Sequence, residues 1–404
     1  MSIPLRLRLV HLSDLHLGYR QYQRLTPRGI NQREADVAQS FTRALDKVIE
    51  LAPDVVLIGG DVFHQVRPTN TAILHAYLQF ARLRAMLPQT EIVMVAGNHD
   101  TPRSTDTGSI LRLFAALGLH VVDAEPRALD FPALDLTVLA VADNQHPRPK
   151  LVPTGTRRWN VLLLHGEVEG MLGPFAATRE PASQEIAQED LYSSAWDYIG
   201  LGHYHVYRRI APNQFYSGSL DYTSTNTWGE KMEEELAGVP GKGIIEHDLS
   251  TGRHTFHHLP PARVFIDLPA VSARGLTTEE VNERVLAAID ACPGGIDDKV
   301  VRLVVRDLPR HITRQLDHRQ LRDFRRRALH FHLDTRRPEM IRSVGHGAPG
   351  RRPSLADFVR DKLRERVVGA DVDRDALVTL GLRYLKDAEE REGASTASTS
   401  GLEG

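Results

Sequence analysis

The first 260 residues repeat one pattern, a short apolar run of strand length that ends in glycine and polar residues. Between the early runs lie two longer segments, 34–50 and 71–87, whose apolar residues recur with helical spacing. Buried strands that alternate with helices indicate an α/β domain with parallel or mixed strands. The six runs are RLRLVHLSD, DVVLIGGD, EIVMVAGN, LTVLAVAD, NVLLLHGE and WDYIGLGH.

We place this α/β domain at residues 1–260. The rest of the chain, which follows it in sequence, divides into smaller parts. Residues 242–260 predict a hairpin that turns at Ser250-Thr251-Gly252. Residues 261–340 read as an α+β module of three strands and two helices, with a basic run, RQLRDFRRR, that is either a solvated helix face or a contact to a phosphate backbone. We expect a flexible linker at 341–354, two amphipathic helices at 355–393 and a disordered tail at 394–404. The helical pair needs a surface to pack on, either its own protein or a partner.

Composition narrows the chemistry that the chain can use. Of its 404 residues only Cys292 is a cysteine, so an intramolecular disulfide is excluded and any metal site must be built from histidine and oxygen ligands. The net charge of −2 gives no global field for nucleic acid or membrane. The sequence contains no apolar run long enough for a signal peptide or a membrane span, so we expect a cytoplasmic protein.

Five of the six apolar runs end in side chains that can bind metals. Because ligands bind at the carboxyl ends of the strands in α/β sheets, we expect these five segments to meet at one site. The seven candidate ligands are too many for one tetrahedral ion and suit two ions that share a carboxylate. Without thiolates, this set favours manganese or iron, and such a pair of ions can activate water for phosphoester hydrolysis. The candidates are Asp14, His16, Asp61, Asn98, His165, His203 and His205.

The stretch GHYH shows how two neighbouring ligands could be divided. If it continues a strand, His203 and His205 project the same way, into one cleft. Such a pair by itself is also compatible with a structural role. The number of candidate ligands indicates that the two histidines serve different ions, with Tyr204 pointing away into packing.

The motifs DLH, GDVFH, GNHD, LLHGE and GHYH together resemble those of the calcineurin-like metallophosphoesterases. Within that group, SDLHLG, GDVFH and FYSGSLDYTS resemble DNA double-strand-break repair nucleases of the SbcD type. This resemblance implies a four-layer α/β sandwich of mixed sheets flanked by helices, a small α+β capping domain that contacts DNA, and a C-terminal helical arm. It also implies two divalent ions, with manganese favoured, a coiled-coil ATPase partner of the SbcC type bound by the arm, and a homodimer formed through helices such as 71–87.

The resemblance also implies individual roles. Asp14, His16 and His205 would hold the first ion, Asn98, His165 and His203 the second, and Asp61 would bridge both. His99 would stabilise the developing charge and protonate the leaving group, His64 would assist exonuclease action, and Asp100 would orient His99.

The function expected from these features is that of a DNA exonuclease and endonuclease acting with an ATPase in double-strand-break repair. Two alternatives stay open: a general metallophosphodiesterase for nucleotides or lipid-linked phosphates, and a DNA-end tethering scaffold with a vestigial site. Competent residues at all seven ligand positions argue against the scaffold. Phe63-His64-Gln65 and Asp100 depart from the protein-phosphatase branch, which has Asp-Arg after the second motif and Gly-Asn-His-Glu at the third.

Overall fold

The computed structural model describes residues 6–102, 108–143, 150–170, 185–338, 354–366 and 373–399. The chain forms two compact units, 1–338 and 339–404, and each is treated by itself.

The first of two large sheets has the strand order β14-β13-β1-β2-β3-β4. Its four strands β1 to β4 are parallel, and the hairpin β13–β14 adds two antiparallel strands at the edge of β1. The hairpin turns where the sequence predicted, with the amide of Gly252 donating to the carbonyl of Asp248 (2.8 Å). The strands are β1 (Arg8–Leu12), β2 (Val55–Ile58), β3 (Glu91–Val95), β4 (His120–Val122), β13 (Gly243–Asp248) and β14 (Arg253–His258).

The second sheet has the order β11-β12-β10-β7-β6-β5, with β6, β7, β10 and β12 parallel and antiparallel strands at both edges. The six predicted runs therefore divide equally between the two sheets. The strands are β5 (Arg127–Phe131), β6 (Leu136–Val141), β7 (Trp159–His165), β10 (Tyr198–Gly202), β11 (Arg208–Ala211) and β12 (Gln214–Tyr216); the short strands β8 (Glu167–Val168) and β9 (Glu185–Ile186) pair separately.

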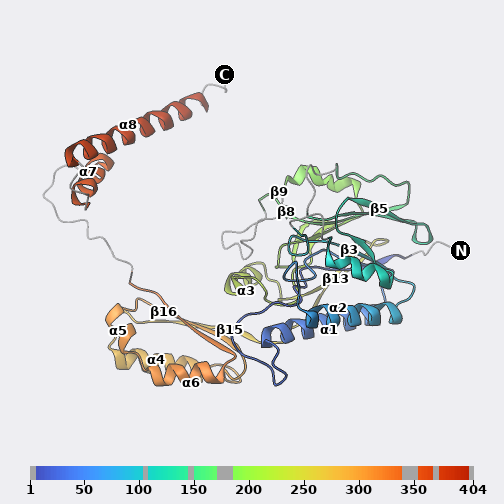
Figure 1. The fold of residues 1–404 in the computed structure, drawn as a ribbon, viewed down its shortest axis with the longest axis horizontal. Helices are drawn as coiled ribbons and strands as arrows, with labels where there is room; N and C mark the ends of the chain where they lie inside the picture. Colours follow the sequence, from blue (N-terminus) through green and yellow to red (C-terminus); the bar gives the residue numbers. More distant parts are fainter. Residues whose placement is uncertain are drawn as a thin grey trace. The chain divides into compact units, whose positions relative to one another are not determined.

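The two sheets pack face to face and are covered on their outer faces, which confirms the predicted sandwich. Side chains such as Leu57 of β2 and Leu163 of β7 share the core between the sheets. Helices α1 (Gln32–Leu51) and α2 (Asn70–Met86), which run side by side in Figure 1, cover the first sheet together with η2 (Ile110–Leu117). In the described part of the chain, the fourth layer over the second sheet is made by the short 3₁₀ helices η4 (Gln188–Leu191) and η5 (Ser193–Ala195) with nearby loops. A further 3₁₀ turn, η3 (Pro132–Leu134), joins β5 to β6.

Capping side chains fix where the covering helices begin. The side chain of Asn31 accepts from the amides of Arg33 and Glu34 at the start of α1, and that of Thr69 accepts from Ala72 at the start of α2. Helix α1 then buries residues such as Phe41 and Leu45, four apart, against the sheet.

The predicted α+β module follows as a three-stranded, fully parallel sheet with its own core. The structure adds one short helix, α5, to the predicted order of elements. The elements are β15 (Phe265–Ser272), α4 (Thr278–Asp290), β16 (Val300–Arg306), α5 (Arg310–Gln315), α6 (His318–Arg327) and β17 (His330–Thr335).

Charged and aromatic contacts join this module to α1 of the sandwich and to the loop that precedes α1. The guanidinium of Arg263 donates twice to the carboxylate of Asp36 (2.8 and 3.0 Å), and Nη1 of the buried Arg33 contacts Oδ2 of the same carboxylate (3.2 Å). The ring of Tyr22 stacks on that of His330, with 4.0 Å between centroids. These contacts place the module in the same compact unit as the sandwich.

The C-terminal unit contains two helices, α7 (Leu355–Glu365) and α8 (Arg374–Thr399). Helix α7 begins at a capping box formed by Ser354 and Asp357. Helix α8 continues to Thr399, beyond the end at residue 393 that the sequence predicted. The expected linker, apart from Ser354, and residues 400–404 of the expected tail lie outside the described residues.

Candidate metal centre

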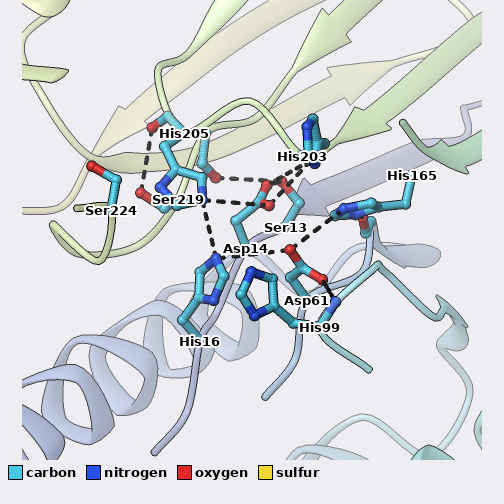
Figure 2. Close-up of polar contacts among 12 residues, drawn as sticks. Ser13, Asp14, His16, Asp61, His99, His165, His203, His205, Ser219 and Ser224 are labelled. Carbon is cyan, nitrogen blue, oxygen red and sulfur yellow. Dashed lines mark hydrogen bonds and ion pairs between the residues drawn. The ribbon is translucent and has the colours of Figure 1, made fainter. Parts of the chain in front are cut away.

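Loops at the carboxyl ends of strands from both sheets bring the candidate ligands together (Figure 2). Strands β1, β2 and β3 of the first sheet and β7 and β10 of the second each lead directly into one group. In chain order these groups are Asp14 and His16; Asp61; Asn98; His165; and His203 and His205.

One cluster consists of Asp14, His16 and His205, all buried. The Nε2 atoms of His16 and His205 face each other at 3.0 Å, and Nε2 of His205 lies 3.9 Å from Oδ1 of Asp14. These three side chains point their donor atoms at one small volume, as Figure 2 shows.

A second cluster consists of Asp61, His165 and His203, and Asn98 joins it through its amide oxygen. Oδ1 of Asn98 lies 3.0 Å from Nε2 of His165 and 3.2 Å from Nδ1 of His203. Nε2 of His165 lies 3.4 Å from Oδ2 of Asp61.

Asp61 faces both clusters with the same oxygen atom. Its Oδ2, 3.4 Å from His165, is also 3.9 Å from Nε2 of His16 in the first cluster. Its other oxygen, Oδ1, accepts a hydrogen bond from the amide of His99 (2.9 Å). The carboxylate is therefore held by the main chain in a position from which it can bridge two ions.

The donor set and its spacing fit divalent cations. Two ligand atoms at right angles around one ion, each about 2.1 Å from it, lie about 3 Å apart. Three distances between ligand atoms are close to this value: 3.0 Å between His16 and His205, 3.0 Å between Asn98 and His165, and 3.2 Å between Asn98 and His203. The carboxylates of Asp14 and Asp61 are both buried, and burying two negative charges side by side is unfavourable unless cations balance them.

Burial and neighbouring charge shift the proton affinities of these groups. Burial lowers the pKa of His16 well below its usual value, and the adjacent imidazoles lower it further. Burial also acts to lower the pKa of His165, but the carboxylates of Asp61 and Asp14 raise it to about 9. Burial raises the pKa of Asp61, while the positive charge of His165 opposes that effect. With a pKa of about 9, His165 is protonated at neutral pH, so an ion that binds through this imidazole must displace the proton.

His64 and His99 lie at the half-buried rim of the site. Their rings stack, with 5.2 Å between centroids, and Nδ1 of His99 contacts the carbonyl oxygen of His64 (2.7 Å). Nδ1 of His64 lies 3.3 Å from Nδ1 of His16. The imidazoles of His16, His64 and His99 also lie close enough together to make a third group of possible metal ligands, beside the two buried clusters.

Asp100 contacts the main chain of two ligand loops. Its carboxylate accepts from the amides of Val62 (3.0 Å), Phe63 (3.0 Å) and Gly97 (3.1 Å). Burial, followed by the charge of Asp61, raises its pKa to about 7. The resemblance implied that Asp100 orients His99. The hydrogen bonds of its carboxylate instead link the loop that follows β2 to the loop that follows β3.

The backbone at the site has unusual conformations. Asp14, His16, Asp61 and His203 all have positive φ, at 53°, 45°, 49° and 104°. Strand β10 ends at Gly202, so the strand alternation used to predict the directions of His203 and His205 does not apply there, and the structure places them in different clusters.

Two glycines permit close approaches that no other residue allows. A Cβ at Gly97 would overlap the carboxylate of Asp61, and one at Gly202 would overlap the main-chain oxygen of Gly59.

Sequence reasoning did not single out helix α3 (Thr227–Leu236), although it lies against His205. The side chain of Glu230 in this helix approaches Nδ1 of His205. A segment such as GEKMEEEL is typical of a solvated surface helix, and no local signal distinguishes it from one.

Comparison with known proteins agrees with the site's composition. Residues 7–228 match the family described as calcineurin-like phosphoesterase. Several curated relatives carry the name DNA double-strand break repair protein Mre11. The relative from Methanococcus maripaludis is 37% identical over 261 residues (60% of this chain, 63% of the relative). Those from Methanocaldococcus jannaschii and Thermoplasma acidophilum are each 28% identical, over 248 and 258 residues (60% of this chain, 62% of each relative). The match thus spans less than two thirds of these relatives' length.

Among the described residues, no helix is long and apolar enough to cross a membrane.

Proposed function

The chain belongs to the calcineurin-like phosphoesterase family, and we propose that it is a metal-dependent nuclease that hydrolyses DNA phosphodiester bonds at double-strand breaks. The observation that carries this proposal is the pair of ligand clusters joined by Asp61, with His64 and His99 beside them at a half-buried rim. The named relatives support DNA as the substrate.

Two divalent ions would be held by the two clusters, with Asp61 between them, and would supply an activated water and neutralise charge on the phosphoryl oxygens. The absence of thiolates from the donor set favours manganese. Asn98 and His165 would bind one ion together with His203, while Asp14, His16 and His205 would bind the other.

His99 would transfer the proton in this reaction. If its Nδ1–H donates to the carbonyl of His64, the ring is held in one tautomer, and Nε2 can carry a proton to the departing oxygen. Asp100 would keep the ligand loops in register through its three main-chain contacts. His64 would assist from its place beside His16 and His99.

The α+β module would contact the DNA backbone. Arg319, Arg322 and Arg325 of α6 are exposed, and exposed guanidinium groups bind phosphates without regard to base sequence. Arg327 is paired with Asp297, so only part of the basic run is available for DNA.

The C-terminal helices would bind a coiled-coil ATPase. Helix α7 packs on α8, yet both leave large apolar side chains in solvent: Leu355 (58% exposed), Phe358 (48%) and Tyr384 (65%). Such apolar side chains suit a partner helix. On helix α2, Leu74 and Leu78 are 59% and 55% exposed one turn apart, which supports a homodimer formed through this helix.

The test compares linear duplex DNA with bis-p-nitrophenyl phosphate as substrates, in the presence of manganese. We expect both to be hydrolysed. Hydrolysis of the ester alone would establish a general phosphodiesterase instead, and a purified protein that binds no metal and cuts neither substrate would establish the scaffold.

A further inference from the structure

Helix α3 buries carboxylates where its sequence predicts a solvated surface. Of its glutamates, Glu230 is fully buried, and Glu233 and Glu234 are 8% and 5% exposed. A buried carboxylate is stable only with hydrogen-bonding or charged partners, so the partners of these side chains indicate what the helix does.

The first partner of Glu230 is a histidine of the metal centre. Its Oε1 lies 3.4 Å from Nδ1 of His205 and accepts from the amide of Ser224 (3.2 Å). The opposite ring edge of His205, at Nε2, faces His16 (3.0 Å). The imidazole therefore has one nitrogen toward Glu230 and the other toward the site. A carboxylate in this position fixes the tautomer and orientation of a metal-binding histidine.

The second partner of Glu230 is the buried Lys242, which also contacts the main chain of His205. Nζ of Lys242 lies 2.6 Å from Oε2 of Glu230 and 3.0 Å from Oε1 of Glu234. It also donates to the carbonyl oxygen of His205 (2.9 Å). The ammonium thus binds both the backbone of His205 and the carboxylate that contacts its ring.

Tyr204, which precedes His205 in the chain, is hydrogen-bonded to the same helix. The hydroxyl of Tyr204 donates to Glu233, and Tyr204 itself is buried. Helix α3 therefore contacts two successive residues, Tyr204 and His205, which follow the end of β10 at Gly202.

We propose that Glu230 and Lys242 are positioning residues, which hold Nε2 of His205 toward the ion bound with Asp14 and His16 and so set the affinity for that ion. This inference rests on the proposed metal centre. It concerns one of the two ions, because Glu230 contacts His205, Lys242 and the amide of Ser224, none of which belongs to the cluster of His165 and Asn98.

The experiment titrates metal-stripped protein with Mn²⁺ and measures free Mn²⁺ by electron paramagnetic resonance. Glu230→Gln keeps the shape of the side chain but removes its charge, and Glu230→Asp keeps the charge but withdraws the oxygens. We expect both variants to bind one ion about 10- to 100-fold more weakly than the unmodified protein and the other ion with unchanged affinity. The matched control is Glu235→Gln, which removes a charge from an exposed position on the same helix and should leave the binding of both ions unchanged.

A second measurement separates positioning from general damage. Circular dichroism and thermal unfolding of the metal-free proteins identify any variant that does not fold, and Glu230→Asp carries the test if Glu230→Gln fails. Adding Glu230→Gln to His205→Ala should not weaken Mn²⁺ binding further, because the effect passes through His205.

The possible results distinguish this inference from the proposed function. Unmodified protein that binds fewer than two ions would overturn the metal centre itself. Two ions in the unmodified protein, with unchanged affinity in the folded Glu230 variants, would overturn only the positioning role. Equal weakening by Glu235→Gln would also overturn the positioning role, and so would further weakening in the double variant.

Discussion

Arg33 offers a sharp test of how the sandwich is joined to the α+β module. Its side chain is fully buried, and its Nη2 lies 2.6 Å from Oδ1 of Asp221 and donates to the carbonyl of Tyr222 (3.0 Å). Its Nη1 lies 3.2 Å from Asp36, and its guanidinium carbon lies 4.9 Å from the ring centre of Phe265 in the module. Replacing Arg33 with Met keeps much of the volume and removes the charge.

The size of the effect follows from what each carboxylate retains. Asp36 keeps its two hydrogen bonds from Arg263. Within the described residues, Asp221 keeps two neutral donors, the hydroxyl of Ser40 (2.7 Å) and the amide of Tyr222 (2.8 Å). Breaking a buried ion pair by removing one partner destabilises a fold by about 3–5 kcal/mol, so we expect Arg33→Met to lower the free energy of unfolding by this amount.

Urea denaturation followed by tryptophan fluorescence measures this loss. The double variant Arg33→Met/Asp221→Asn should recover a large part of it, because no buried charge is then left without a counter-charge. Arg263→Met is the control: it removes a cation from Asp36 but leaves Arg33, and should cost about 1 kcal/mol. If the free energy of unfolding of Arg33→Met lay within about 1 kcal/mol of that of the unmodified protein, the buried charge of Asp221 would not need Arg33. A double variant as unstable as the single variant would lead to the same conclusion.

Three further predictions concern the site, the arm and pH. His99→Ala should lower the rate of DNA hydrolysis by about 10²- to 10⁴-fold and leave two Mn²⁺ ions bound, as measured by metal analysis; loss of an ion would instead make His99 a ligand, with His16 and His64. Deletion of residues 351–404 should leave hydrolysis of bis-p-nitrophenyl phosphate unchanged and remove stimulation by the ATPase; a shortened chain that is still fully stimulated would contradict the proposed role of the arm. Burial, reinforced by the charge of His254, lowers the pKa of His11 to about 3. Below about pH 6.5 the unfolded chain therefore binds a proton at His11 that the folded chain does not bind. As the pH is lowered from there, the free energy of unfolding decreases by up to about 1.4 kcal/mol per pH unit. His11→Gln should reduce this slope in denaturation measured between pH 7 and 5; an unchanged slope would show that His11 does not contribute.

The strands and the candidate ligands could be predicted because their signals are local. Each apolar run is followed within a few residues by its polar groups, as His165 follows β7 directly, so strand and ligand are read from the same short segment. The carboxyl ends of parallel strands then bring distant ligands together without any knowledge of the strand order.

The order of the strands within each sheet and the surroundings of His205 could not be predicted in the same way. Pairing of β1 with β13 joins residues more than 230 positions apart, and no property of either strand alone specifies it. The charge of Glu230 indicates solvent exposure until Lys242 and His205 are seen beside it. The positive φ of His203 likewise depends on contacts from elsewhere, including the hydrogen bonds from its amide to Asp14.

The left-handed backbone at Asp14, His16, Asp61 and His203 bears on how a chain of this kind can change over generations. Each such conformation costs a non-glycine residue about 1 kcal/mol or more, which the surrounding fold offsets. Glycine at any of the four positions would relieve that strain and remove a proposed metal ligand in one substitution. A duplicate gene released from selection for catalysis could therefore gain robustness by the same step that silences it, whereas the active lineage must keep its strained residues and conserve the contacts that hold them.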